Sequence, residues 1–244
     1  MKVERHSPSS LNLFCASPAM FVLERIMGRR QPVGAAAHRG TAVEAGIAAG
    51  LVDLDRPVEE CIEIAATKYR SLIGLCTDPS VEAKEKTIPA MVRQGLDELR
   101  PYGTPSSQQG FVEWRPEGLQ SPIVGFYDFE WANHGIVVDL KTTEKLPSSI
   151  KLPHARQVGL YGPAISDNID ARLTYVTPIK RATYRLENVR EHRDALLRIA
   201  LVVERFLALS DDPAFFASIT APDFDHFYWT APAARQAGFE AWGF

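Results

Sequence analysis

The chain has 244 residues, of which 45% are hydrophobic and 23% are charged. This is the composition of a folded globular protein, and it excludes a disordered chain. With 27 Lys and Arg against 30 Asp and Glu, the formal net charge is −3, so no global positive field indicates a nucleic-acid-binding protein and any DNA contact requires a local basic patch.

The first hundred residues have the pattern of a helical region. Apolar residues recur at helical spacing, and serine, proline and glycine mark the helix ends. Pro18 falls inside the first helix, where it predicts a kink or a division into two shorter helices. The expected helices cover about 10–27, about 33–49, a segment that begins at Pro57, and about 81–99.

The segment from Tyr102 to Gln109 is rich in Pro, Gly and Ser, which indicates a linker or turn. Short β-rich segments and further helical segments follow it. The turn at 132–135 joins two of the strands into a hairpin. The expected strands cover 111–114, 123–131, 136–140, 173–176 and 182–186. The expected helices of this region cover about 150–161 and about 189–209.

This order of elements predicts an α/β fold, with a mixed central sheet flanked by helices and an N-terminal helical region. At about 100–200 residues per domain, the length predicts one domain, or one domain with an appended lobe, and we take 1–244 as a single domain. Its parts are the helical region at 1–101, a sheet-and-helix core at 109–209 and an aromatic-rich tail at 210–244.

The cysteines and the N-terminal residues indicate a cytoplasmic protein. Cys15, Cys61 and Cys76 form no C-x-x-C pair, and their odd number argues against a disulfide framework. We therefore expect reduced thiols, each buried as a small apolar side chain. The N-terminal residues lack the apolar run of a secretory signal, and no segment approaches the ~20 apolar residues that cross a membrane.

The predicted hairpin brings charged residues close together. Side chains alternate across a strand, so Asp139 and Lys141 share one face, and Asp128 lies on the adjoining strand. Apolar neighbours indicate that this hairpin is mostly buried, where charges need partners or a metal ion. Two carboxylates suit Mg²⁺ or Mn²⁺, and a nearby lysine can orient a water and stabilise charge on a phosphate. The alternative is a salt-bridged hairpin in which Lys141 pairs with an aspartate.

Two helices carry further candidates for the same site. Gln157 and Tyr161 are four residues apart and His154 precedes Gln157 by three, so they share one helix face. Glu44 lies among alanines, where a carboxylate that faces the core needs a partner such as a metal site. The alternatives are a helix that packs through its apolar residues with the polar ones in water, and a solvent-facing Glu44.

Four motifs occur in an order that resembles the PD-(D/E)XK nuclease superfamily, and most closely its RecB-like branch, which includes CRISPR-adaptation and phage exonucleases. They are Gly40-Thr41-x-x-Glu44, Gly125-x-x-Asp128, Asp139-x-Lys141 and Gln157-x-x-x-Tyr161. The segment from Ser7 to Phe21 also looks like the opening helix of that branch, so the resemblance covers about residues 7–161. It implies a restriction-endonuclease-like core.

The resemblance also implies a role for each motif residue. The implied ligands of Mg²⁺ or Mn²⁺ are Glu44, Asp128, Asp139 and the backbone carbonyl of Leu140. The implied catalytic residues are the three carboxylates together with Lys141, Gln157 and Tyr161. Iron–sulfur members of the branch use one N-terminal and three C-terminal cysteines, but no cysteine follows Cys76, so no iron–sulfur cluster is expected here.

The leading hypothesis is therefore a metal-dependent DNA nuclease, an exonuclease of DNA recombination, DNA repair or phage DNA processing. Its substrate is single- or double-stranded DNA, and a recombination or repair protein is a partner. The polar and cationic residues expected to contact DNA are Arg39, Lys145, Lys151, His154 and Arg156.

Two other functions compete with this hypothesis. One is a non-catalytic DNA-binding or assembly module that retains the nuclease fold, although such a module need not keep the whole set of motifs. The other is a hydrolase of a different class that uses two carboxylates, such as a glycosidase. A glycosidase does not explain a lysine two residues after Asp139, or the polar helix that follows it.

Overall fold

The computed structural model describes residues 1–166 and 169–243, which fall into two compact units. The first unit comprises Met1–Pro32, Glu113–Gly125 and Arg190–Phe244, and the second comprises Val33–Val112 and Phe126–Val189. The prediction of a single domain over 1–244 stays a prediction.

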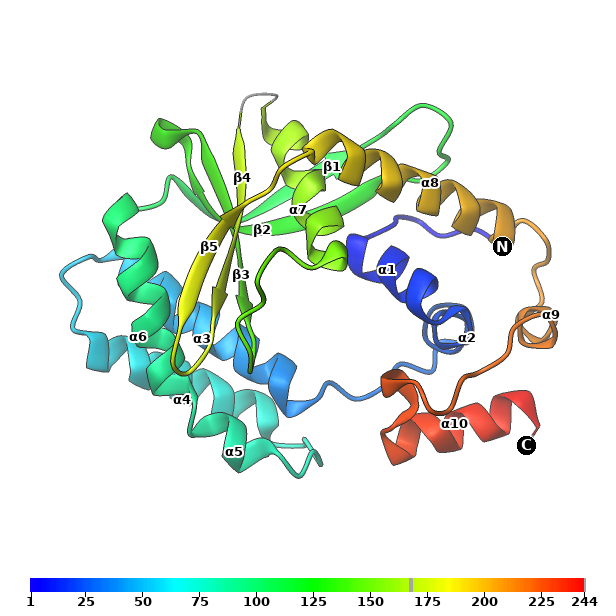
Figure 1. The fold of residues 1–244 in the computed structure, drawn as a ribbon. Coiled ribbons are helices and arrows are strands. Elements are labelled where there is room, and N and C mark those ends of the chain that lie inside the picture. The colour runs from blue at the N-terminus through cyan, green and yellow to red at the C-terminus, as the bar shows by residue number, and fades with distance from the viewer. Residues whose placement is uncertain (167–168, 244) are drawn as a thin grey trace. The chain divides into compact units, whose positions relative to one another are not determined.

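Five strands form one mixed sheet in the order β1-β2-β3-β4-β5 (Figure 1). β2 and β3 are antiparallel, β3 and β4 are parallel, and β4 and β5 are antiparallel. The parallel pair is connected by helix α7 (Leu152–Ile165), as a parallel crossover requires. The strands are β1 (Ser107–Trp114), β2 (Ile123–Trp131), β3 (Ile136–Thr142), β4 (Asp170–Val176) and β5 (Arg181–Arg185).

The α/β fold with a mixed sheet is thus confirmed, and the strands lie close to their predicted positions. The expected hairpin is present, and its turn contains a short 3₁₀ helix, Ala132–His134, closed by Gly135 at φ 62°. Glycine is suited to this left-handed position because it has no Cβ. The largest difference is in β1, which begins at Ser107 instead of residue 111.

Four helices of the second unit precede the sheet in the chain and pack together beside it. They are α3 (Ala35–Val52), α4 (Val58–Ile73), α5 (Val81–Glu85) and α6 (Ile88–Leu99), followed by a 3₁₀ turn, Arg100–Tyr102. The single helix expected over 81–99 is two helices. Pro89 explains the division, because proline is tolerated in the first turn of α6 but would break the interior of a continuous helix.

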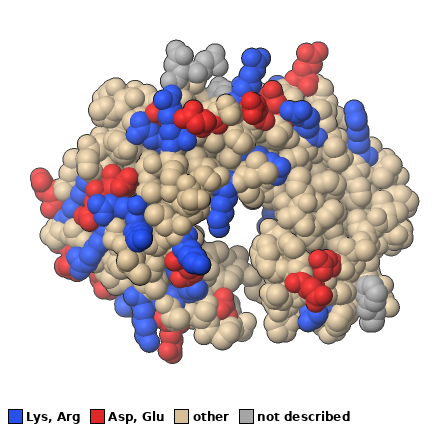
Figure 2. All heavy atoms as spheres, viewed as in Figure 1, with Lys and Arg blue, Asp and Glu red and all other residues tan. Residues whose placement is uncertain are grey.

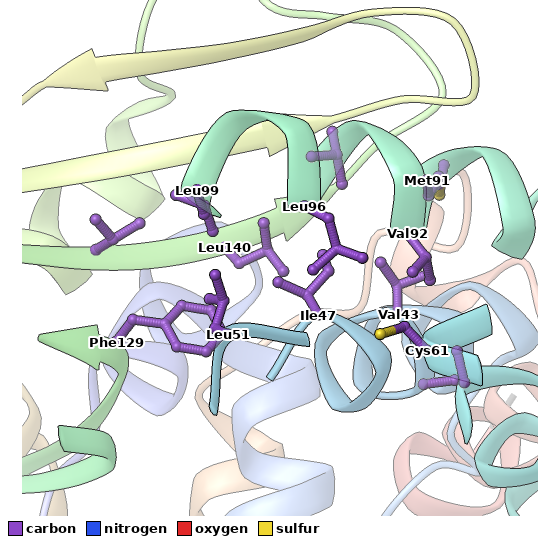
Figure 3. Close-up of a cluster of buried hydrophobic side chains, with 14 of the residues drawn as sticks. Val43, Ile47, Leu51, Cys61, Met91, Val92, Leu96, Leu99, Phe129 and Leu140 are labelled. Carbon is purple, nitrogen blue, oxygen red and sulfur yellow. The ribbon is translucent and has the colours of Figure 1, made fainter. Parts of the chain in front are cut away.

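A cluster of apolar side chains fixes these helices to the sheet. Alternation along β3 directs Val138 and Leu140 into this cluster, and therefore directs Asp139 and Lys141 to the other face. Figure 3 shows the cluster between the helices and the strands. Its labelled members are Val43, Ile47, Leu51, Cys61, Met91, Val92, Leu96, Leu99, Phe129 and Leu140.

The contact between α3 and α4 depends on Gly46. A Cβ added there would lie 2.5 Å from the backbone oxygen of Cys61 and 2.9 Å from the Cβ of Ala65. We expect Gly46→Ala to destabilise the protein by about 1–3 kcal/mol, because overpacking outweighs the better helix propensity of alanine. Urea unfolding measures this free energy.

A matched control for this prediction is Gly74→Ala, since an added Cβ at Gly74 has open space around it. The control should change the free energy of unfolding by less than about 0.5 kcal/mol. Equal stabilities of the Gly46→Ala variant and the wild type would contradict the close packing of α3 on α4.

The first unit is mainly helical. The helix expected over 10–27 is divided at Pro18, and Ser7 caps its first part through a reciprocal pair of hydrogen bonds with Ser10. The aromatic tail folds as well, because Trp229 is buried and packs against Phe224 at 5.3 Å between ring centroids. The helices are α1 (Pro8–Ala16), α2 (Pro18–Phe21), a π-helical turn (Val22–Ile26), α8 (Val189–Leu207), α9 (Pro213–Ser218), a 3₁₀ turn (Phe227–Trp229) and α10 (Pro232–Trp242).

Only one of the three cysteines is buried, although all three were expected to be. Cys61 is buried in the core of the second unit, but Cys15 is exposed and Cys76 is half-buried.

Among the residues described here, no helix has both the length and the apolar character needed to span a bilayer.

Candidate active site

The β2–β3 hairpin positions the two predicted aspartates and the lysine. Asp139 is 1% exposed, and one of its oxygens, Oδ2, forms an ion pair with the Lys141 ammonium. Asp128 is also buried, and its Oδ2 accepts a hydrogen bond from the Leu140 backbone N–H at 2.7 Å. The two strands therefore bring both carboxylates and the ammonium to one place, as the sequence predicts.

Helix α7 supplies the second group of predicted residues. The Gln157 amide donates to Asp139 Oδ1 at 3.1 Å and to the Tyr161 hydroxyl at 2.6 Å. The Tyr161 hydroxyl in turn donates to Asp139 Oδ1 at 3.4 Å, and Tyr161 is 1% exposed. Both α7 residues thus hold one oxygen of Asp139, which leaves its other oxygen to Lys141.

Glu44 of α3 joins this cluster through Gln109, a residue that sequence reasoning does not single out. The Gln109 side-chain amide donates to Glu44 Oε1 and also to Asp128 Oδ1, the latter at 3.1 Å. Gln109 lies in the part of β1 that the sequence assigns to a linker, so its pairing with β2 could not be anticipated.

Burial and charge repulsion raise the pKa values of Glu44 and Asp128. Burial and the charge of Asp139 raise the pKa of Glu44 to about 7. Burial, followed by the charges of Asp139 and Glu44, raises the pKa of Asp128 well above its usual range. For Lys141, burial opposes the charged form, but Asp139 and Asp128 prevail and raise its pKa. The ammonium therefore stays protonated at neutral pH.

The donor set fits a hard divalent cation. Two buried carboxylates, Asp128 and Asp139, and the half-buried Glu44 supply the oxygen ligands that Mg²⁺ and Mn²⁺ prefer. The buried Asp139 Oδ2 has its ion pair with Lys141 but no further partner among the described residues. Within the part of the chain that the structure describes, no three His, Cys, Asp or Glu residues are arranged to hold a metal ion. The Gln109 amide instead donates to both Glu44 and Asp128, and Lys141 pairs with Asp139.

The remaining predicted residues lie in different environments. Lys145 and Lys151 are exposed, and Arg156 is half-buried. His154 is half-buried and shares a hydrogen bond of 2.7 Å with the Tyr175 hydroxyl. Burial, followed by the charge of Lys141, lowers the pKa of His154 to about 4, so its ring is neutral at pH 7. The backbone N–H of Leu140 donates to Asp128, as described above. The role of the Leu140 carbonyl as a metal ligand stays a prediction.

Arg39, which the sequence predicts to contact DNA, is buried in an ion pair. It is 2% exposed, and its guanidinium donates to Glu144 at 2.7 Å and to the Thr87 hydroxyl at 3.2 Å. Lys84 also pairs with Glu144, at 2.6 Å. This burial favours a structural ion pair over contact with DNA. Acidic and basic side chains are likewise interspersed on the face shown in Figure 2.

Comparisons with known proteins identify the family of the chain. The family model of the PD-(D/E)XK nuclease superfamily matches residues 5–237. No curated protein matches the chain. Among solved structures, the crystal structure of SSO0001 is similar over 88% of this chain and 94% of that chain, with 14% identity and a TM-score of 0.37, which is too distant to bear on function. Because the family model covers nearly the whole length, the chain belongs to the PD-(D/E)XK nuclease superfamily.

Proposed function

We propose that this protein is a metal-dependent deoxyribonuclease, an exonuclease of the RecB-like type that acts in DNA recombination, DNA repair or phage DNA processing. The observation that carries the proposal is the convergence of Glu44, Asp128 and Asp139, the two aspartates buried, with a protonated Lys141. Membership in a superfamily of phosphodiester hydrolases favours this chemistry over the hydrolysis of a glycoside.

The three carboxylates and the Leu140 carbonyl would hold Mg²⁺ or Mn²⁺. When bound, such a cation lowers the pKa of a coordinated water and neutralises charge on the phosphate. The Lys141 ammonium donates hydrogen bonds to the phosphate oxygens, where negative charge develops as the phosphodiester bond breaks. Because Lys141 remains protonated beside Asp139 and Asp128, it acts as a donor and not as a base.

Gln157 and Tyr161 orient the site. They hold Asp139 Oδ1 by two hydrogen bonds, so the carboxylate cannot rotate freely and its Oδ2 stays directed at Lys141. Groups that are fixed before the reaction begins lower the barrier more than groups that must reorganise. In this role Gln157 and Tyr161 position a ligand and need not touch the reacting atoms.

The DNA backbone would be held near the loop between β3 and α7. Lys145 and Lys151 are exposed there and can pair with phosphates, and Arg156 and His154 on α7 complete the proposed contacts. His154 is neutral at pH 7, so it would contribute a hydrogen bond and not a charge. Contacts of this kind weaken as the salt concentration rises.

A cleavage assay tests the proposed function. End-labelled linear single-stranded and double-stranded DNA is incubated with the protein in Mg²⁺, Mn²⁺ or EDTA, beside closed circular DNA. We expect cleavage of linear DNA with either metal, none in EDTA, and resistance of the circular substrate, which has no end. Cleavage of the circle would replace the exonuclease by an endonuclease. DNA binding without cleavage of any substrate would support the non-catalytic module instead.

A further inference from the structure

The Gln109 side chain has an unusual environment for an amide. Its nitrogen donates to two carboxylates at once, Glu44 of α3 and Asp128 of β2. An amide NH₂ group has two hydrogens, so both contacts can form together. When the two carboxylates are ionised they only accept hydrogen bonds, which fixes the amide with its nitrogen toward them. The nitrogen therefore lies within hydrogen-bond reach of two of the carboxylates that would hold the cation.

The backbone holds Gln109 in this position. Its φ is +51°, a left-handed conformation that residues other than glycine rarely adopt. Gly110 follows, and an added Cβ there would overlap the Tyr127 ring, so this ring packs directly on the backbone next to Gln109. A strained backbone persists only where its surroundings fix it, and such residues cluster at ligand sites.

We propose that the Gln109 amide substitutes for the cation in the metal-free protein, and that it has to leave Glu44 and Asp128 before a divalent cation can bind both. This inference rests on the proposed function. The amide screens two carboxylates that would otherwise repel each other, so it keeps them close together. It also competes with the metal, because binding the metal costs both hydrogen bonds. Gln109 is thus a positioning residue that sets the affinity of the site.

Removing the amide should change stability and metal affinity in opposite directions. We expect Gln109→Gly to bind Mn²⁺ about tenfold more tightly than the wild type, because hydrogen bonds to charged groups are strong and no longer have to be broken. In EDTA the same variant should have a lower Tm, because the carboxylates are no longer screened. Isothermal titration calorimetry with Mn²⁺ and thermal unfolding in EDTA give the two readouts.

The variants are chosen to separate this effect from loss of the fold. Glycine adopts a positive φ without strain, and Gln109→Asn is also tolerated there but is too short to bridge both carboxylates. Both variants should shift Mn²⁺ affinity in the same direction. Gln108→Ala is the matched control, because the neighbouring Gln108 amide donates to the Ala48 backbone oxygen and to neither carboxylate.

The outcomes distinguish this inference from the proposed function. Weaker or unchanged Mn²⁺ binding in both Gln109 variants, with a wild type that binds Mn²⁺, would overturn the inference about Gln109 alone. A wild type that binds no Mn²⁺ would overturn the proposed metal site itself. Tighter binding by the Gln109 variants together with an unchanged Gln108→Ala control would support both.

Discussion

Lys141→Ala is expected to reduce the rate of DNA cleavage by about a hundredfold to a thousandfold, the usual cost of removing one donor that stabilises charge in a transition state. Lys141 is the cation paired with Asp139, and the carboxylates around it raise its pKa, so it is fully charged under assay conditions. The rate is measured with linear end-labelled DNA at saturating Mg²⁺. DNA affinity, measured separately, should change much less.

Two comparisons make the result specific. Lys145→Ala removes an exposed lysine four residues further along, so it should weaken DNA binding, most strongly at low salt, but preserve the cleavage rate of bound DNA. Lys141→Ala also leaves Asp139 without its ion-pair partner, so its fold is checked by circular dichroism in the presence of Mg²⁺. A folded Lys141→Ala variant that cleaves at the wild-type rate would remove Lys141 from the mechanism.

The hairpin was predictable from the sequence because its signals are local. The apolar runs of β2 and β3 are separated by a turn with Gly135, and alternation along β3 then fixes Asp139 and Lys141 on one face. The spacing of Gln157 and Tyr161 on α7 is equally local, and the structure brings both to Asp139. Short-range patterns thus predicted which side chains share a face.

The features that were not predictable depend on contacts between distant parts of the chain. The position of Gln109 requires a left-handed backbone at a residue that gives no such signal, and a strand that begins earlier than its apolar residues suggest. The burial of Arg39 depends on Glu144, which is 105 positions away. A single sequence shows neither contact. The sequence therefore places Gln109 in a linker, although it bridges two carboxylates, and predicts a DNA contact for Arg39, although it forms a buried ion pair.

Glu44→Gln should raise the stability of the metal-free protein at pH 8 and reduce metal-dependent cleavage by at least about a hundredfold, because a ligand of a catalytic metal is lost. The pKa of Glu44 rises from 4.5 to about 7 on folding, chiefly through burial. The folded protein therefore binds a proton more tightly than the unfolded chain between these values. Stability falls as pH rises through this window, by up to about 3 kcal/mol for this group.

Because glutamine does not titrate, this loss of stability between about pH 4.5 and 7 should be smaller in Glu44→Gln than in the wild type. Urea unfolding in EDTA at pH 5 and pH 8 measures the difference.

Glu144→Gln is the matched control, because the pKa of Glu144 is lowered by its hydrogen bond to Lys84 and its contacts with Arg39. Its carboxylate stabilises the fold above its usual pKa, so this substitution should destabilise the protein at pH 8, the opposite sign. A Glu44→Gln variant that is less stable than the wild type at pH 8 in EDTA would mean that the Glu44 carboxylate stabilises the fold. The proposed metal site would then consist of Asp128 and Asp139 without Glu44.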